Sequence, residues 1–142
     1  MSKAIYTIAF DLGGVVFSAD NDIFSNKYLE TELTPGIFQL ILHLSRHAQV
    51  KLIIISKAFP KNAKKSREIL QAYGLDELFN SIIFCENNHS KFAIAKAMNV
   101  NIMIDDKKDV LDCFDSTIKT FLFTNNRVNE LYKLIHTLID FK

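Results

Sequence analysis

The chain has 142 residues, of which 49% are hydrophobic and 23% charged, and its net charge is +1. These values are typical of one soluble globular domain, and the near-neutral charge argues against a nucleic-acid partner or an anionic membrane surface. Cys85 and Cys113 lack the spacing of a zinc site, and no apolar run approaches the roughly 20 residues of a transmembrane helix, so a cytoplasmic protein with reduced thiols is expected.

The first element in the chain is an apolar segment, residues 5–17, that is interrupted by Asp11 and by the pair Gly13-Gly14. A short run rich in Ile, Tyr and Phe and bounded by glycine predicts a strand buried on both faces, as in the middle of a parallel sheet. Asp11 then stands at the carboxyl end of that strand, where open α/β sheets bind their ligands. The glycines allow the main chain to approach a ligand closely.

A polar stretch, residues 18–34, follows and is expected to be a loop with one or two helical turns. Strands and helices alternate after it. The expected strands are Val50–Ile55, Ser81–Phe84, Val100–Ile104 and Ile118–Phe123. The first expected helix is opened by Thr34-Pro35, and the second runs from about Asn62 to its stop at Gly74, with Tyr73 facing inward. The next two are Lys91–Met98, capped by Ser90, and Val110–Phe114. Asn125 or Asn126 caps the last helix. This alternation predicts an α/β fold, a three-layer α/β/α sandwich around a parallel sheet.

Polar residues follow three of the later expected strands. Ser56 ends the second strand, Lys91 begins the helix after the third, and Asp105-Asp106 follow the fourth. The two adjacent carboxylates repel each other, and a divalent cation would relieve that repulsion. A helix-capping serine, a solvated lysine and an acidic loop would explain each feature alone, but not their placement with Asp11 at successive strand ends.

Taken together, these segments resemble the four motifs of the haloacid dehalogenase (HAD) superfamily, which consists mostly of Mg²⁺-dependent phosphatases. The resemblance covers nearly the whole chain. It implies a Rossmann-like five-stranded parallel sheet in the order 3-2-1-4-5, and one domain over residues 1–142. The last expected helix reaches Lys142 without a stop signal, so this domain is either the whole protein or the N-terminal domain of a longer one.

The resemblance also implies roles for single residues. Asp11 is the nucleophile that forms an aspartyl-phosphate, Ser56 binds a phosphoryl oxygen, and Lys91, preferred over Lys57 and Lys96, neutralises negative charge. The implied Mg²⁺ ligands are Asp11, the backbone carbonyl of Gly13 and one of Asp105 and Asp106, of which Asp106 is favoured, and Asp109 is a candidate outer-shell group. The substrate-binding residues are Leu12, Gly13, Ser56, Lys57 and Lys91.

One position departs from the HAD pattern. Gly13 stands where family phosphatases carry a second Asp, whose general acid catalysis is worth roughly 10²–10⁴-fold. A phenolate, with a pKa near 10, leaves with less help than an alkoxide, so the change favours aryl phosphates such as phosphotyrosine. Asp20, Asp22 or a water molecule could replace the missing acid.

The intervals before Ser56 and between Ser56 and Lys91 are too short for the family's cap domain. An open site is therefore expected, with a macromolecular substrate such as a phosphotyrosine protein. The alternatives are a catalytically weak phosphate-binding or protein-interaction module, and a small-metabolite phosphatase closed by a dimer partner or by residues 18–34. A cysteine-dependent phosphatase is rejected, because the position that needs Arg after Cys85 holds Lys91. The sequence leaves the oligomeric state open.

Overall fold

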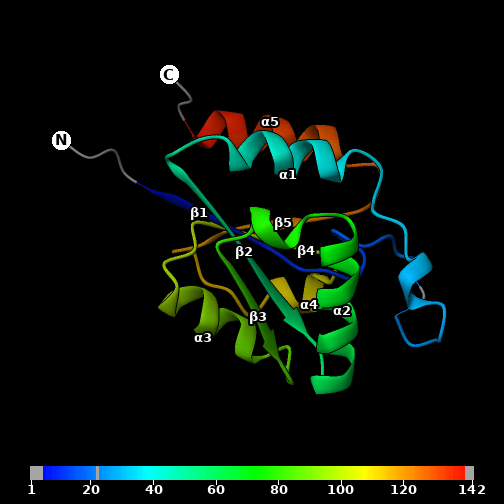
Figure 1. The fold of residues 1–142 in the computed structure, drawn as a ribbon. Helices are drawn as coiled ribbons and strands as arrows, with labels where there is room; N and C mark the ends of the chain where they lie inside the picture. The colour runs from blue at the N-terminus through cyan, green and yellow to red at the C-terminus, as the bar shows by residue number, and fades with distance from the viewer. Residues whose placement is uncertain (1–4, 22, 140–142) are drawn as a thin grey trace.

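The structure is a computed structural model that describes residues 5–21 and 23–139. Its centre is a five-stranded sheet in which every pairing is parallel and the order is β3-β2-β1-β4-β5 (Figure 1). The strands are β1 (Tyr6–Phe10), β2 (Val50–Lys57), β3 (Ser81–Cys85), β4 (Ile102–Asp105) and β5 (Lys119–Leu122). The predicted sheet and strand order are thereby confirmed. Strand β2 is two residues longer than expected, and its last residue, Lys57, pairs with Cys85.

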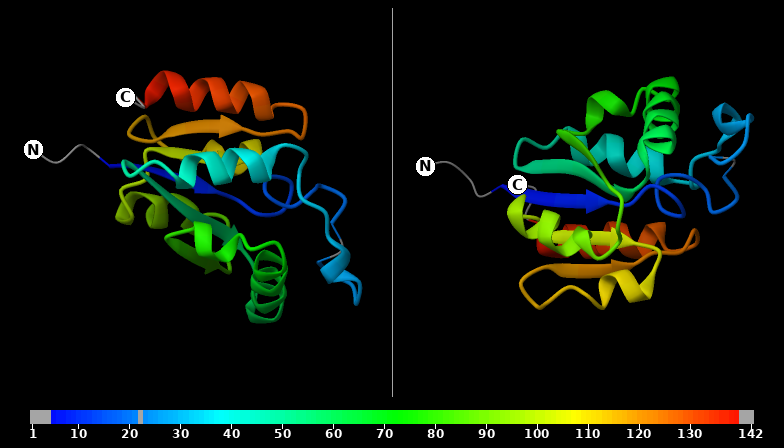
Figure 2. Two further views of the ribbon diagram at one scale, coloured as in Figure 1. Left: turned by 45° about the horizontal axis from the view of Figure 1, so that its top comes forward. Right: turned by 90° about the horizontal axis from the view of Figure 1, so that it is seen from below.

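Helices cover both faces of this sheet (Figures 1 and 2). The helices are α1 (Ile37–Ser45), α2 (Pro60–Ala72), α3 (Ser90–Ala97), α4 (Lys108–Leu111) and α5 (Val128–Leu138), and the 3₁₀ turns are η1 (Tyr28–Glu30) and η2 (Asp76–Leu78). The buried side chains form two clusters. The larger cluster joins the sheet to α1, α2 and α5, and the smaller joins it to α3 and α4. The predicted three-layer sandwich is therefore confirmed.

The alternation of side chains along the central strands supplies both clusters. Ile8 and Phe10 pack in the larger cluster, whereas Ala9 packs in the smaller one, and all three are fully buried. This is the two-residue period of a β-strand with helices on both faces. It explains why β1 is apolar at every position from Ile8 to Phe10, and the carboxylate of Asp11 follows directly where the strand ends.

The starts of α1 and α2 differ from the sequence-based expectation. Gly36, not Thr34, precedes α1, and it lies in the left-handed region with a φ of 84°. Thr34 is instead held in the preceding loop, where its N–H donates to the carbonyl of Val16 (3.0 Å). Helix α2 begins at Pro60, two residues before Asn62, because proline fits the first helical position.

The predicted caps of α3 and α5 are also wrong. His89 precedes α3, so Ser90 is its first residue. Arg127, not Asn125 or Asn126, precedes α5. The side chain of Asn126 is used in the loop before the helix, where its Oδ1 accepts a hydrogen bond from the Thr124 hydroxyl (2.6 Å). Neither helix has a side-chain hydrogen bond from its N-cap residue.

The polar stretch between β1 and α1 lies beside α2 (Figure 1) and contacts this helix through η1. It contains the single turn η1, where Tyr28 donates its hydroxyl to Glu68 and its ring lies 5.1 Å from Lys65 Nζ. Tyr73 was expected to face inward, but it is 38% exposed at the end of α2 and donates its hydroxyl to the carbonyl of Thr31 (2.6 Å). Within residues 5–21 and 23–139, no separate cap domain covers the carboxyl edge of the sheet. None of the described helices is both long enough and apolar enough to cross a bilayer.

Candidate active site

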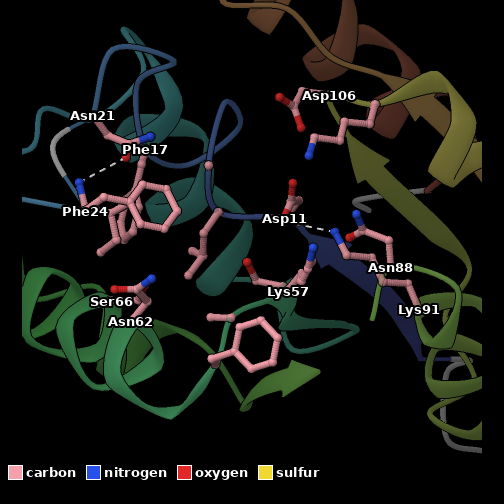
Figure 3. A pocket seen from close by; sticks show the side chains of 17 residues that line it. Asp11, Phe17, Asn21, Phe24, Lys57, Asn62, Ser66, Asn88, Lys91 and Asp106 are labelled. Atoms are coloured by element: carbon pink, nitrogen blue, oxygen red, sulfur yellow. Dashed lines mark hydrogen bonds and ion pairs between the residues drawn. The ribbon is translucent and has the colours of Figure 1, made fainter. Parts of the chain in front are cut away.

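An ion pair at the carboxyl edge of the sheet joins Asp11 to Lys91. Asp11 directly follows β1, and its N–H donates to the carbonyl of Ile104 in β4 (3.0 Å). Lys91 lies in the first turn of α3 and is only 2% exposed. Its Nζ lies 3.2 Å from Asp11 Oδ1 (Figure 3) and 2.8 Å from Asp105 Oδ2. The buried lysine therefore links the end of β1 to the end of β4.

The two adjacent aspartates after β4 have different surroundings. Asp105 is fully buried, and its Oδ2 and Oδ1 accept hydrogen bonds from Lys91 Nζ and from the N–H of Lys107 (3.1 Å). Asp106 lines the cavity in front of Asp11, and its buried Oδ1 has no hydrogen-bond partner among the described residues. Asp106 is therefore the carboxylate of the pair that has a free oxygen beside the cavity.

Gly14 makes room for Asp106. Its φ of 79° lies in the left-handed region, and a Cβ at this position would come within 2.8 Å of Asp106 Cγ. Contacts that short do not occur between real side chains, so a larger residue would have to displace the Asp106 carboxylate. The second glycine of the Gly13-Gly14 pair is thus required by the close approach of an acidic side chain.

The electrostatics of the site favour an added cation. Oxygens of Asp11, Asp105 and Asp106 lie within 4.8 Å of one another. Burial raises the pKa of Asp11 to about 7, with a further rise from Asp105 and Asp106, although Lys91 opposes it. Burial and the neighbouring Asp105 also raise the pKa of Asp106. Burial lowers the pKa of Lys91, but Asp11 and Asp105 outweigh it, so the net direction is upward and Lys91 stays charged.

One lysine cannot neutralise three carboxylates, and the excess negative charge of Asp105 and Asp106 adds to the larger effect of burial in raising the pKa of Asp11. Hard oxygen ligands with unshared electron pairs are what Mg²⁺ and similar divalent cations require. The unpartnered Oδ1 of Asp106 is such a ligand. The donor set is therefore compatible with a divalent cation.

A cavity of about 360 Å³ opens in front of these groups. Seven of the residues expected from the sequence line it: Asp11, Leu12, Gly13, Ser56, Lys57, Lys91 and Asp106. Asp105 lies behind them. Lys96 is remote from the cavity and pairs with Asp115 (3.9 Å).

Of the two aspartates that could replace the missing acid, Asp20 is described by the structure, and it is not part of the site. Asp20 is exposed and does not line the cavity, and Asp22 lies outside the described residues. Asp109, expected as an outer-shell group, is exposed on α4 and does not belong to the carboxylate cluster.

The cavity also contains residues that sequence reasoning missed. They include Phe24, Phe59, Asn62, Ser66, Asn88 and Lys107. Asn62 and Ser66 are four residues apart on α2 and so share one face of the helix, a spacing that could have been noticed. Asn88 lies in the loop after β3, again at a strand end. Phe24 and Phe59 are 83% and 56% exposed, and no sequence signal separates such side chains from core phenylalanines.

Known structures with a similar fold were found, although no protein-family model and no curated protein sequence matches the chain. A chain of the Pnkp1/Rnl/Hen1 complex aligns with a TM-score of 0.64 at 14% identity, over 87% of this chain and 47% of that one. A haloacid dehalogenase-like family hydrolase from Xanthomonas campestris aligns with a TM-score of 0.58 at 9% identity, over 96% of this chain and 98% of that one.

An uncharacterized protein from Listeria monocytogenes serotype 4b gives a TM-score of 0.63 at 9% identity and covers 94% of this chain and 99% of that one. The present chain thus spans nearly the full length of two of these neighbours, but less than half of the matched chain of the Pnkp1/Rnl/Hen1 complex. The expected HAD-like fold is confirmed by this likeness.

Proposed function

We propose that this chain is a Mg²⁺-dependent phosphomonoester hydrolase in which Asp11 is the nucleophile. The observation that carries the proposal is the buried Lys91, which holds the Asp11 carboxylate at the floor of a cavity lined by Asp106. A carboxylate oxygen of Asp11 attacks phosphorus, the bond to the leaving oxygen breaks, and water then hydrolyses the aspartyl-phosphate to release phosphate. The likeness of the fold to a HAD-like hydrolase supports this reaction class.

Each proposed role uses a side chain or backbone group of the cavity. The Lys91 ammonium stabilises charge on the phosphoryl oxygens, and the Ser56 hydroxyl donates a hydrogen bond to one of them. Leu12 and Gly13 bring the main chain to the same place, and Lys57 adds positive charge at the rim. Asp11, Asp106 and the Gly13 carbonyl would hold Mg²⁺, with Asp105 behind them, and the cation would supply charge neutralisation at the nucleophile and the transferring group.

The substrate that these residues favour is an aryl phosphate on a macromolecule, such as a phosphotyrosine side chain. Gly13 provides no general acid, so a phenolate is the leaving group that needs least help. Phe24 and Phe59 line the cavity with most of their surface exposed, and Figure 3 shows Phe24 across the cavity from Lys91 and Asn88. A planar ring that bears the phosphate would cover these two side chains, and stacked aromatic pairs add about 0.5–1.5 kcal/mol beyond area burial.

The direct test compares substrates with and without metal. We expect the protein to hydrolyse p-nitrophenyl phosphate and a phosphotyrosine peptide in the presence of Mg²⁺, to lose this activity in a chelator, and to hydrolyse a phosphoserine peptide or a sugar phosphate much more slowly. Equal rates on sugar phosphates would contradict the substrate assignment and favour a small-metabolite phosphatase. A folded protein that binds Mg²⁺ and turns over none of these substrates would contradict the enzyme assignment and favour a phosphate-binding module.

Installing the missing acid is a second test. The change Gly13→Asp is expected to raise kcat/KM on alkyl phosphates by about 10²-fold, because a carboxylic acid would protonate the leaving alkoxide. The position has room: a Cβ on Gly13 would meet only Asn21 Nδ2, at 3.9 Å, and Gly13 is not among the glycines with positive φ. The measurement is the ratio of alkyl to aryl phosphate turnover.

Gly13→Asn is the matched control for that substitution. It has the same size as Gly13→Asp but no proton to give, so the ratio should stay at the wild-type value. Equal ratios for the two variants, both folded, would show that general acid catalysis at this position does not limit the reaction.

A further inference from the structure

Two histidine side chains from different helices meet on the face of the sheet that α1 and α5 cover. His43 lies in the last turn of α1 and His136 in the last turn of α5. Their Nε2 atoms are 3.3 Å apart, and their rings are within 16° of parallel. Figure 1 shows the two helices side by side. Because α1 leads directly into β2, this contact lies at the amino edge of the sheet, opposite to the candidate active site.

The orientation of His136 is fixed by its own helix. Its Nδ1 lies 2.9 Å from the carbonyl oxygen of Tyr132, one turn earlier in α5. A carbonyl can only accept, so Nδ1 carries the hydrogen, and Nε2 of the neutral ring presents a lone pair toward His43. Histidine ligands of metal ions are oriented in this way, with the second ring nitrogen donating to a backbone carbonyl.

We propose that His43 and His136 bind a transition-metal cation of the class that prefers imidazole, with Zn²⁺ as the expected ion. A tetrahedral zinc with Zn–N bonds of about 2.0–2.1 Å separates two nitrogen ligands by about 3.3–3.4 Å. The two Nε2 atoms are already at that separation. Mg²⁺, which prefers oxygen ligands, is not expected to compete for this site.

The helix dipoles at the pair favour a cation, whereas the positive charge of the nearby Arg46 opposes one. Both histidines lie at the carboxyl ends of helices, where the helix dipole is negative. Burial, together with His47, His136 and Arg46, lowers the pKa of His43, so its ring is neutral near physiological pH, which is the form that binds metal ions.

Two other side chains lie near the pair. The hydroxyl of Tyr132 lies 3.3 Å from His43 Nε2, and the ring of His47 lies 4.9 Å from that of His43. Within the described part of the chain, Asp11, Asp105 and Asp106 form the one group of three or more His, Cys, Asp or Glu ligand atoms, so water would have to complete the coordination of a cation held by the two histidines. A cation bound here would join α1 to α5 and stabilise that layer of the fold.

The test is a titration of the full chain with Zn²⁺ by calorimetry at neutral pH with excess Mg²⁺, paired with Cu²⁺ electron paramagnetic resonance. We expect a binding event with nitrogen couplings from two imidazoles. The affinity should fall at least about tenfold in His43→Gln and in His136→Gln, because each change removes one ligand. His89→Gln, which alters the imidazole beside Cys113, is the matched control and should bind as the wild type does.

One further test uses the wild type alone and so does not rely on the folding of a variant. In the wild type, the two-nitrogen spectrum should be lost on acidification, because protons compete with the metal ion for the imidazole nitrogens. A spectrum with oxygen ligands alone, or unchanged affinity in His136→Gln, would overturn the proposal and leave the contact as a histidine–histidine hydrogen bond.

Discussion

Replacing Asp11 with Asn is expected to lower phosphoester turnover by about 10⁴-fold or more, because the amide cannot attack phosphorus and nucleophiles of covalent mechanisms carry effects of that size. Asn has nearly the same size and shape as Asp, so the substitution removes the negative charge beside Lys91 without changing the volume of the cavity. The measurement is kcat/KM on an aryl phosphate with Mg²⁺. Asp109→Asn is the matched control, since Asp109 is exposed outside the carboxylate cluster, and it should retain wild-type turnover.

The same variant separates catalysis from folding through its dependence on pH. Without a divalent cation, the pKa of Asp11 is about 7 in the folded chain and lies near 3.9 when the residue is unfolded. A raised pKa in the folded state means that the contribution of Asp11 to stability is full below about pH 4 and is lost as the pH rises toward 7. Asn cannot ionise, so Asp11→Asn should gain thermal stability relative to wild type across this range.

Mg²⁺ should reduce that advantage, because a bound cation stabilises the ionised wild-type carboxylate. Two results would contradict this account: wild-type turnover in the Asp11→Asn protein, or melting temperatures of the two proteins that run parallel from pH 4 to pH 8 in a chelator. The first result would contradict the assignment of Asp11 as the nucleophile, and the second would contradict the raised pKa of Asp11 in the folded chain.

The placement of the site could be predicted from the sequence because it depends on strand ends. In a parallel sheet the carboxyl ends of all strands meet at one edge, so Asp11 and Ser56 had to lie near each other once the strands were recognised. Even the different surroundings of the two aspartates follow from the two-residue period. Met103 packs toward α3, so Asp105 faces the same layer and meets Lys91, which lies on α3.

Features that depend on tertiary contacts could not be predicted in this way. Thr34 was expected to cap α1, but its N–H bonds to Val16, in a segment whose position no local signal specifies. Phe24 lines the cavity from the segment before α1, whose turn η1 packs against α2, and no local signal predicts that contact. His43 and His136 are 93 residues apart, and their contact depends on α1 and α5 being neighbours on one face of the sheet.

Lys91 joins the catalytic proposal to the stability of the fold, and its replacement by Met is expected to destabilise the protein by about 3–5 kcal/mol, because removing one partner leaves buried carboxylates uncompensated. Two carboxylates, Asp11 and Asp105, lose their ammonium partner, and both are almost fully buried. The measurement is denaturant unfolding in a chelator at about pH 8. Turnover should be lost as well, since no charge remains at this position to stabilise the phosphoryl oxygens.

Lys96→Met on the same helix is the matched control for Lys91→Met. Lys96 is 53% exposed and its ion pair with Asp115 spans 3.9 Å, so its loss should change the free energy of unfolding by less than about 1 kcal/mol. The destabilisation of Lys91→Met should shrink at low pH, where Asp11, with its raised pKa, is protonated, and in excess Mg²⁺, which replaces part of the missing positive charge. A Lys91→Met protein as stable as Lys96→Met at pH 8 in chelator would mean that the carboxylates are compensated without the lysine, and the charge balance on which the metal site rests would then be wrong.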